Sequence, residues 1–216
     1  MMTATVKAPP SESELIHRIL SGDRELYYDL VAPYERMVYV SAFSLLRNEA
    51  EAEDCAQDAF LKAFRHLSEF KGESKFGSWL VRIALNEAKM RLRKMRASLY
   101  DSLDQVIEGE DDEYTPQTLG DWREIPSEDL ERKEVREILQ KAIEKLPEKY
   151  RVVLVLREVQ NLDVATTAKI IGVSEAVVKT RLLRARLQVR DLLAPALTSS
   201  HIFSRHAFKK GKNPWL

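Results

Sequence analysis

The residues between positions 163 and 190 combine helix signals with side chains that can bind a polyanion. Asp163 and Ser174 are residue types that begin helices, and Gly172 lies between the two segments that they introduce. Two helices joined by a short glycine-containing turn are typical of a helix-turn-helix. In this motif the second helix enters the major groove of DNA, where Arg and Lys reach guanine edges and phosphates. The pattern therefore predicts binding to duplex DNA.

The outer face of the second helix supplies side chains for base contacts. Lys179 and Arg184 can donate to guanine or phosphate, whereas Thr180 and Leu183 can contact the methyl group of thymine. The predicted duplex-DNA contacts are Ser174, Glu175, Lys179, Thr180, Leu183, Arg184 and Arg186. The alternative interpretation is an ordinary helical hairpin with a solvated basic face.

A second basic stripe follows a short aromatic loop in the first half of the chain. Polar residues at helical spacing form it: Trp79, Arg82, Asn86, Lys89 and Arg93. Unpaired bases stack on aromatic rings and phosphates need cations, so residues 70–96 have the chemistry to bind single-stranded nucleic acid. The alternative is that Phe70, Phe76 and Trp79 belong partly to the core and that the charges are a solvated helix face.

The segment 49–67 predicts a helix with one apolar and one acidic face. Alanine and aromatic residues recur in it at the i, i+3, i+4, i+7 spacing of a buried stripe. The opposite face comprises Glu53, Asp54, Gln57, Asp58 and Leu61. Such a face is either solvated only or docks on a basic protein partner.

The chain offers little for catalysis or metal binding. Its single cysteine, Cys55, lies on the apolar stripe of 49–67, and one cysteine forms neither an intramolecular disulfide nor a Cys-based zinc site. Glu14 and His17 form one Glu-x-x-His pattern, whereas a di-metal helical bundle needs two. No glycine-rich phosphate loop occurs. We predict no catalytic residue, no metal site, no cofactor and no enzymatic activity.

The elements that must position these faces are all predicted to be helices. Helical periodicity covers 12–96 and returns after residue 126, and no strand pattern of period two occurs. Pro33 is expected to break or kink the segment 23–46, Ser127 to cap the segment 127–146, and Pro147 to end it. Residues 97–126 hold glycines, prolines and an acidic run, which is typical of a linker.

We therefore predict an all-α fold of two small helical domains, a four-helix domain and a C-terminal helix-turn-helix domain, joined by a flexible acidic linker. The predicted segments are a flexible N-terminus at 1–11, a helical domain at 12–96, a linker at 97–126, a helix-turn-helix domain at 127–194 and a tail at 195–216.

Charge is segregated along the chain. The 34 basic and 34 acidic residues cancel overall, but the net charge is −6 over 1–61, +7 over 62–96, −11 over 97–131 and +10 over 132–216. This asymmetry indicates separate surfaces for separate partners. No run of 18 or more apolar residues and no signal-peptide core occurs, which predicts a soluble, cytoplasmic protein without membrane insertion.

Together these motifs resemble the sigma factors of bacterial RNA polymerase, in their compact extracytoplasmic-function (ECF) subgroup. The stretches that carry the resemblance are 52–64, 70–86, 146–151 and 172–186. It covers about residues 25–96 and 128–193. The resemblance implies a protein that binds core RNA polymerase and directs promoter-specific transcription initiation. An anti-sigma factor is a further partner that it implies.

The resemblance also implies a role for each surface. The acidic face of Glu53, Asp54, Gln57, Asp58 and Leu61 resembles the surface that docks on the polymerase. The −10 promoter element, captured as single strand, is expected to contact Lys71, Ser74, Lys75, Phe76, Trp79, Arg82, Asn86 and Lys89. The −35 element, read as duplex, is expected to contact the helix that begins at Ser174.

Two features depart from the family pattern. Family members usually carry an acidic pair in the first helix of the helix-turn-helix, where this chain has Thr166 and Thr167, and the tail 195–216 extends beyond the usual end. The alternative function is a stand-alone helix-turn-helix transcriptional regulator. Such a regulator needs an effector or receiver domain, and residues 12–96 show no α/β pattern or ligand signature.

Overall fold

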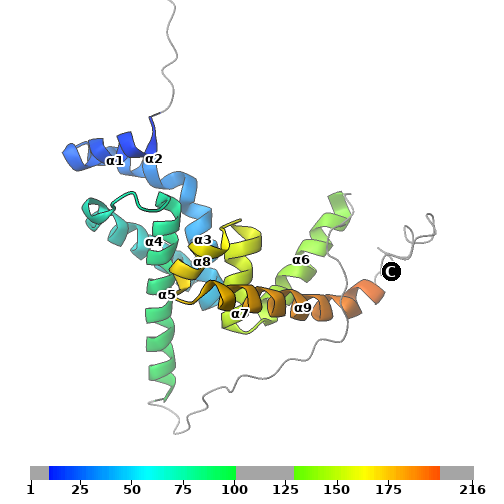
Figure 1. The fold of residues 1–216 in the computed structure, drawn as a ribbon. Coiled ribbons are helices and arrows are strands. Elements are labelled where there is room, and N and C mark those ends of the chain that lie inside the picture. The colour runs from blue at the N-terminus through cyan, green and yellow to red at the C-terminus, as the bar shows by residue number, and fades with distance from the viewer. Residues whose placement is uncertain (1–9, 101–128, 200–216) are drawn as a thin grey trace, which may run out of the picture. The chain divides into compact units, whose positions relative to one another are not determined.

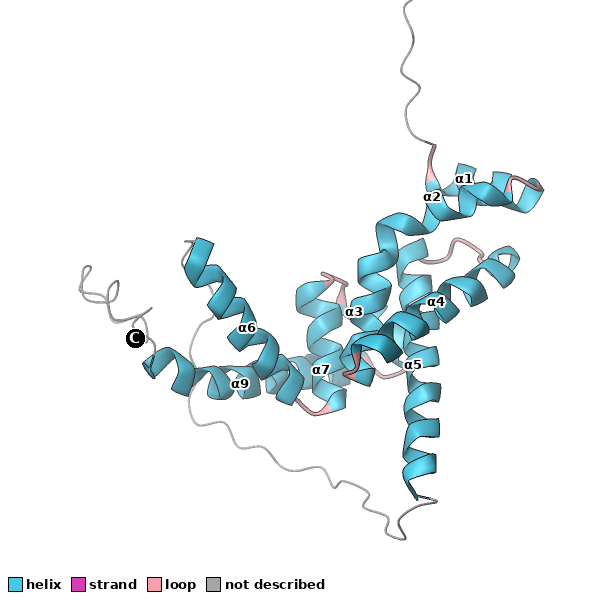
Figure 2. Ribbon diagram, turned by 180° about the vertical axis from the view of Figure 1, so that it is seen from behind, coloured by secondary structure: helices cyan, strands magenta, loops and turns pink. Residues whose placement is uncertain are grey.

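The computed structural model describes residues 10–100 and 129–199, which are helical with short connections (Figure 1). The chain divides into two compact units, Met1–Ser98 (unit 1) and Leu99–Leu216 (unit 2). No strand occurs in the described ranges, as the colouring by secondary structure in Figure 2 shows. The all-α prediction is confirmed. The predicted N-terminal segment up to residue 9, most of the linker, the Ser127 cap and the tail from residue 200 lie outside the described residues.

Unit 1 contains the helical segments expected from the sequence. In chain order these are α1 (Glu12–Ser21), η1 (Arg24–Leu26), α2 (Tyr27–Val31), η2 (Ala32–Tyr34), α3 (Glu35–Leu46), α4 (Glu49–Arg65), η3 (Leu67–Glu69) and α5 (Phe76–Tyr100). Pro33 lies in the 3₁₀ turn η2, so the segment 23–46 is broken there, as predicted. Helix α5 continues to Tyr100, four residues beyond the predicted end at Arg96.

Side-chain caps begin two of these helices. The Ser11 hydroxyl oxygen accepts a hydrogen bond from the Glu14 amide at 3.3 Å, which is the predicted cap of α1. The Asn48 side chain accepts from the Glu51 amide at 3.0 Å at the start of α4. Arg47 adopts the left-handed conformation that ends α3, with φ of 55°. Asn48 and Arg47 together separate α3 from α4.

The core of unit 1 collects side chains from every helix of the unit. Leu30, Leu67 and Leu80 are at most 2% exposed, and each contributes about 1.5–3 kcal/mol through burial. Ala59 and Ala63 of α4 are fully buried, and their small side chains allow neighbouring helices to approach closely. Since α4 and α5 both contribute to this core, their solvent-facing sides are held on one body.

Unit 2 contains the helix-turn-helix. Its elements are α6 (Asp129–Lys145), α7 (Glu148–Leu154), the π-helical turn η4 (Val155–Val159), α8 (Val164–Ile171) and α9 (Glu175–Ser199). Val153, Val178 and Ala185 are fully buried where α7 and α9 pack together. Helix α9 runs to Ser199, past the predicted domain end at 194.

The turn between α8 and α9 has the predicted geometry. Asp163 caps α8 by accepting from the Thr166 amide at 2.7 Å. Gly172 ends α8 in the left-handed conformation at φ of 75°, which glycine adopts without steric cost. Ser174 accepts from the Val177 amide at 3.3 Å at the start of α9. The sequence signals for both helices are therefore confirmed.

The π-helical turn η4 was not predicted from the sequence. It closes with the Gln160 amide donating to the Val155 carbonyl at 3.0 Å, a span of five residues. A single π turn has no periodic hydrophobic pattern, so residues 155–159 cannot be distinguished from an α-helix by spacing.

Candidate DNA-binding and protein-docking surfaces

The outer face of α5 carries exposed polar and basic side chains. Arg82 and Asn86 are exposed, and Lys89 is half-buried one turn further along. The preceding loop adds Lys71 and Lys75, both exposed, together with the exposed Ser74. Among the described residues of unit 1, none of these cations forms an ion pair, so the surface keeps a positive charge that suits a phosphate backbone.

The aromatic residues beside this face belong to the core. Phe76 is 1% exposed and Trp79 is 8% exposed, and their ring centroids lie 5.7 Å apart. Phe70 is half-buried and packs on both rings, at 5.4 and 5.3 Å. Little of either ring is exposed, which favours the core alternative, and the DNA contacts of Phe76 and Trp79 stay predictions. The core interpretation fits these two rings.

Helix α4 presents its acidic side chains on two different sides. Glu53, Asp54 and Gln57 are exposed, and Leu61 is 55% exposed on the same outward side. These four residues are called the docking face below. Asp58, predicted to belong with them, is half-buried and its carboxylate is paired with Arg91 of α5. Asp58 therefore lies at the edge of the docking face and also contacts α5 through Arg91.

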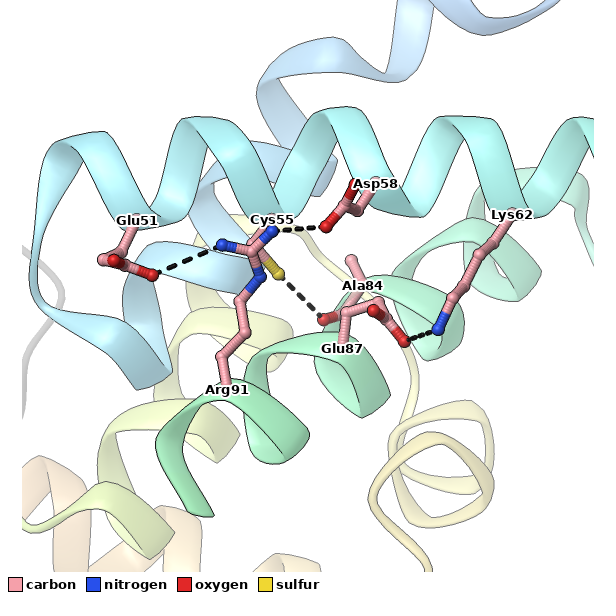
Figure 3. A network of polar contacts seen from close by, with 7 residues as sticks. All are labelled: Glu51, Cys55, Asp58, Lys62, Ala84, Glu87 and Arg91. Atoms are coloured by element: carbon pink, nitrogen blue, oxygen red, sulfur yellow. Dashed lines mark hydrogen bonds and ion pairs between the residues drawn. The ribbon is translucent and has the colours of Figure 1, made fainter. Parts of the chain in front are cut away.

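A row of polar contacts joins α4 to α5 (Figure 3). Residues of this α4–α5 seam are Glu51, Cys55, Asp58 and Lys62 from α4, and Ala84, Glu87 and Arg91 from α5. The Arg91 guanidinium donates to Glu51 at 3.3 Å and, through its other terminal nitrogen, to Asp58. Lys62 donates to Glu87, which is 8% exposed. Arg91 and Glu87 were not predicted, because helical spacing does not distinguish a charged residue that pairs with another helix from one that faces solvent.

Cys55 lies in the middle of the α4–α5 seam and is fully buried. Its thiol is 3.6 Å from the Ala84 carbonyl, to which it donates. Burial raises the pKa of the Cys55 thiol to about 11, so the sulfur stays protonated near neutral pH. Burial and the raised pKa support the predicted packing role of Cys55.

Helix α9 exposes most of the predicted duplex-DNA contacts. Glu175, Lys179 and Thr180 are exposed and Leu183 is 52% exposed. The Thr180 hydroxyl donates to the Ala176 carbonyl at 3.0 Å, which leaves its methyl group for apolar contact. Ser174 is exposed and is also the cap of the helix.

The two predicted arginines of α9 are held by neighbours within unit 2. Arg186 pairs with Glu158 of η4 at 2.6 Å, and Arg184 is half-buried with the Tyr150 hydroxyl 3.4 Å away. Val177, which is not among the predicted contacts, is 36% exposed three residues before Thr180. Position on the helix is the signal that could have identified Val177, since residues three before a predicted contact share its face.

The threonine pair that departs from the family pattern completes the cap of α8. The Thr166 hydroxyl donates to the Asp163 carboxylate at 2.7 Å, and the Thr167 hydroxyl donates to the Asp163 carbonyl at 2.8 Å. Hydrogen bonds from the backbone and side chain of Thr166 lower the pKa of Asp163. Thr167 is fully buried, so it presents no surface to a partner.

The described residues show neither a metal centre nor a membrane span. Within 10–100 and 129–199 no three His, Cys, Asp or Glu side chains gather closely enough to hold a metal ion. No helix in these ranges combines the length and apolar character needed to cross a bilayer.

Comparisons with known proteins match both units. Sigma-70 region 2 matches residues 30–98, and sigma-70 region 4 matches residues 136–189. The ECF RNA polymerase sigma factor SigW of Bacillus subtilis is 33% identical over 181 residues, which cover 82% of this chain and 96% of that protein. The RNA polymerase sigma-H factor of Pseudomonas aeruginosa is 33% identical over 188 residues, covering 86% and 95%.

A solved structure shares the fold. The sigma factor RpoE of Bartonella quintana, crystallised with the anti-sigma factor NepR, superposes with a TM-score of 0.60 at 24% identity, over 78% of this chain and 96% of that one. The relatives do not favour a stand-alone regulator, because they match region 2 as well as the helix-turn-helix. The chain belongs to the sigma-70 family, as an ECF-type sigma factor that directs promoter-specific transcription initiation by RNA polymerase.

Proposed function

We propose that this sigma factor divides its task among three surfaces. The docking face of α4 binds core RNA polymerase, the outer face of α5 with the loop before it binds the melted −10 strand, and α9 reads the −35 duplex. The observation that carries this assignment is the opposition of charge on α4 and α5: acidic residues face outward on one helix and basic residues on the other, within one core.

The docking face suits a basic protein surface. Glu53 and Asp54 supply negative charge, and Leu61 supplies an exposed apolar contact of the kind found at interface centres. Complementary charge speeds association and fixes orientation, while apolar burial adds affinity. Asp58 lies at the edge of this face, where Arg91 shares its carboxylate.

The α5 surface suits single-stranded DNA. Lys71, Lys75 and Arg82 supply cations for phosphates, and Ser74 and Asn86 supply hydrogen bonds to bases. Phe76 and Trp79 support this surface from below by filling the core under the loop. Binding energy released on capture of unpaired bases stabilises the melted state, so this chain needs no nucleotide hydrolysis, cofactor or catalytic residue.

The recognition helix suits the −35 major groove. Lys179 offers a donor to guanine, and Thr180 and Leu183 offer apolar contacts to thymine. Each well-placed base contact discriminates by about 1–3 kcal/mol. Val177 adds an apolar side chain beside this set.

Localisation and regulation follow from the same function. Transcription places the working protein in the bacterial cytoplasm. An anti-sigma factor is a further proposed partner, supported by the family and by a structural neighbour, RpoE, that was crystallised with its own anti-sigma factor.

Transcription in vitro with purified core polymerase tests the three surfaces separately. Glu53→Lys with Asp54→Lys should weaken core binding by about a hundredfold, because like charges brought together cost several kcal/mol. Arg82→Ala with Asn86→Ala should bind core normally but reduce the permanganate reactivity of −10 thymines. Lys179→Ala should lower transcription from the specific −35 sequence more than from a scrambled one.

A matched control reverses two exposed acidic residues elsewhere in unit 1. Glu25→Lys with Asp29→Lys changes the net charge by the same amount as the docking-face variant, and it should retain core binding. Normal core binding by the docking-face variant would overturn the assignment of α4. A gel shift without polymerase adds a second criterion: tight, sequence-specific binding by the chain alone would favour the stand-alone regulator.

A further inference from the structure

The α4–α5 seam is polar where packed helices are normally apolar. At this contact Arg91 meets Glu51 and Asp58, and Lys62 meets Glu87. The side chains of Arg91 and Glu87 are 23% and 11% exposed, whereas those of their partners Glu51, Lys62 and Asp58 are 40%, 40% and 49% exposed, so one member of each pair is largely removed from water and the other stays partly solvated. Desolvation offsets much of the attraction in such pairs, and an apolar contact of equal volume is often as stable. Stability alone therefore does not account for the seam.

The geometry of Arg91 accounts for it in another way. Glu51 and Asp58 are seven residues apart, so they lie two turns apart on one face of α4. The guanidinium reaches both through different terminal nitrogens, as Figure 3 shows. A planar guanidinium bound at both ends fixes the position of α5 along α4 and also the rotation of α5 about its axis. A single ammonium group would not fix both.

Arg91 is turned away from the proposed DNA surface. Ala84, Glu87 and Arg91 have the i, i+3, i+7 spacing of one face of α5, and all three contact α4. Arg82, Asn86 and Lys89 form a different face. Burial lowers the pKa of Arg91, but the hydrogen bond to Asp58 and nearby charges raise it, so the net shift of the pKa is upward.

We propose that Arg91 is a positioning residue for promoter opening. It acts through Glu51 and Asp58 to hold the register of α5 against α4, and thereby orients the DNA surface of α5 relative to the polymerase that α4 binds. The proposal rests on the proposed function of these two helices. Its consequence is that a polymerase-bound sigma factor lacking the Arg91 bridge captures the −10 strand poorly.

The experiment compares core affinity with promoter opening for Arg91→Ala and Arg91→Lys. With core polymerase saturated by each variant, we expect Arg91→Ala to lower −10 permanganate reactivity about tenfold, equivalent to about 1.4 kcal/mol. Core affinity should stay within about threefold, because Glu53, Asp54 and Leu61 remain in place. Arg91→Lys should give an intermediate loss, since one ammonium group replaces a two-ended fork.

Two further variants separate positioning from loss of charge or of folding. Lys94→Ala removes one exposed positive charge from the same helix and should open promoters normally. Glu51→Gln leaves Arg91 intact and weakens only one end of the bridge, so its effect should not add to that of Arg91→Ala. Thermal melts monitored by circular dichroism identify any variant that is unfolded. If Arg91→Ala is unfolded, Glu51→Gln still tests the bridge, because it weakens only one of its two ends.

Three outcomes would overturn the proposal. The first is normal promoter opening by Arg91→Ala. The second is an equal loss of promoter opening by Lys94→Ala. The third is a loss by Arg91→Ala that disappears once core polymerase is saturated, because Arg91 would then be a docking residue. A different result would contradict the proposed function itself: normal core binding by the Glu53→Lys, Asp54→Lys variant. The two failures can therefore be told apart.

Discussion

Arg151 shows how one residue can serve the fold while looking like part of a charged surface. It follows the polar pair Glu148 and Lys149 and precedes an apolar run, and it is only 5% exposed. Its guanidinium donates to the carbonyls of Glu144 and Leu146, at 3.1 and 2.7 Å, where α6 ends. The last carbonyls of a helix have no partner within it, and a cation at that end also complements the helix dipole. Arg151 of α7 thus joins the end of α6 to α7 by hydrogen bonds.

Arg151→Met should destabilise unit 2 without changing its surface. Methionine fills a similar volume but leaves the α6 carbonyls without their donor, and hydrogen bonds from charged groups contribute about 1.5–3 kcal/mol. Urea unfolding followed by circular dichroism measures the change. Lys169→Met, at an exposed position of α8, serves as control and should stay within about 0.5 kcal/mol of the parent. A similar midpoint for both variants would contradict the structural role.

Helix α5 depends at its first turn on the absence of a side chain. A Cβ placed on Gly77 would lie 2.5 Å from Cε1 and 2.8 Å from Cδ1 of Tyr34, which packs edge-on against Phe76. Loop residues 70–75 come directly before this turn. The close packing of Tyr34 on Gly77 therefore helps to position the start of the proposed −10 surface. Glycine is normally unfavourable inside a helix, and close packing explains its presence here.

Gly77→Ala should therefore destabilise unit 1, although alanine is the better helix former. Overpacking costs about 1–3 kcal/mol, against a gain in helix propensity of about 1 kcal/mol. The same substitution in a Tyr34→Leu background should be neutral or stabilising, because the ring is gone. Thermal melts of the four proteins in this cycle give the coupling between the two positions. Equal effects in both backgrounds would show that Tyr34 is not the obstacle.

For the whole molecule, zero net charge results from segments that cancel. Residues 97–131 carry −11 and residues 132–216 carry +10, while 62–96 carry +7. Binding to DNA phosphates depends steeply on such positive charge. The acidic stretch is tethered to both basic segments, so it competes with DNA at high local concentration. We expect this competition to weaken DNA binding by the free chain.

Neutralising the acidic run should strengthen DNA binding without polymerase. The variant changes Glu108, Glu110, Asp111, Asp112 and Glu113 to the corresponding amides. Fluorescence anisotropy with nonspecific duplex should show tighter binding at low salt and a steeper dependence on salt concentration. A variant that exchanges Asp and Glu at these positions keeps the charge and should behave like the parent. Unchanged affinity in the amide variant would exclude competition by this run.

The sequence alone determined the features that depend on local chemistry. Asp163, Gly172 and Ser174 specify the helix-turn-helix through capping and a left-handed turn, and Pro33 breaks the helical segment around it. These effects act within a few residues, so spacing suffices to predict them. The same is true of the outward position of Lys179 and Arg82, each of which follows from a clear apolar stripe on the opposite side of its helix.

Tertiary structure alone decided which polar and aromatic side chains turn inward. Spacing placed Phe76 and Trp79 beside a basic stripe, but neighbouring rings bury both. It grouped Asp58 with Glu53 and Asp54, but Arg91 from another helix holds that carboxylate. Burial and ion pairing depend on which residues of distant segments meet, and helical period carries no information about that partner. The physical reason is that a helix specifies its own faces, while packing specifies what each face contacts.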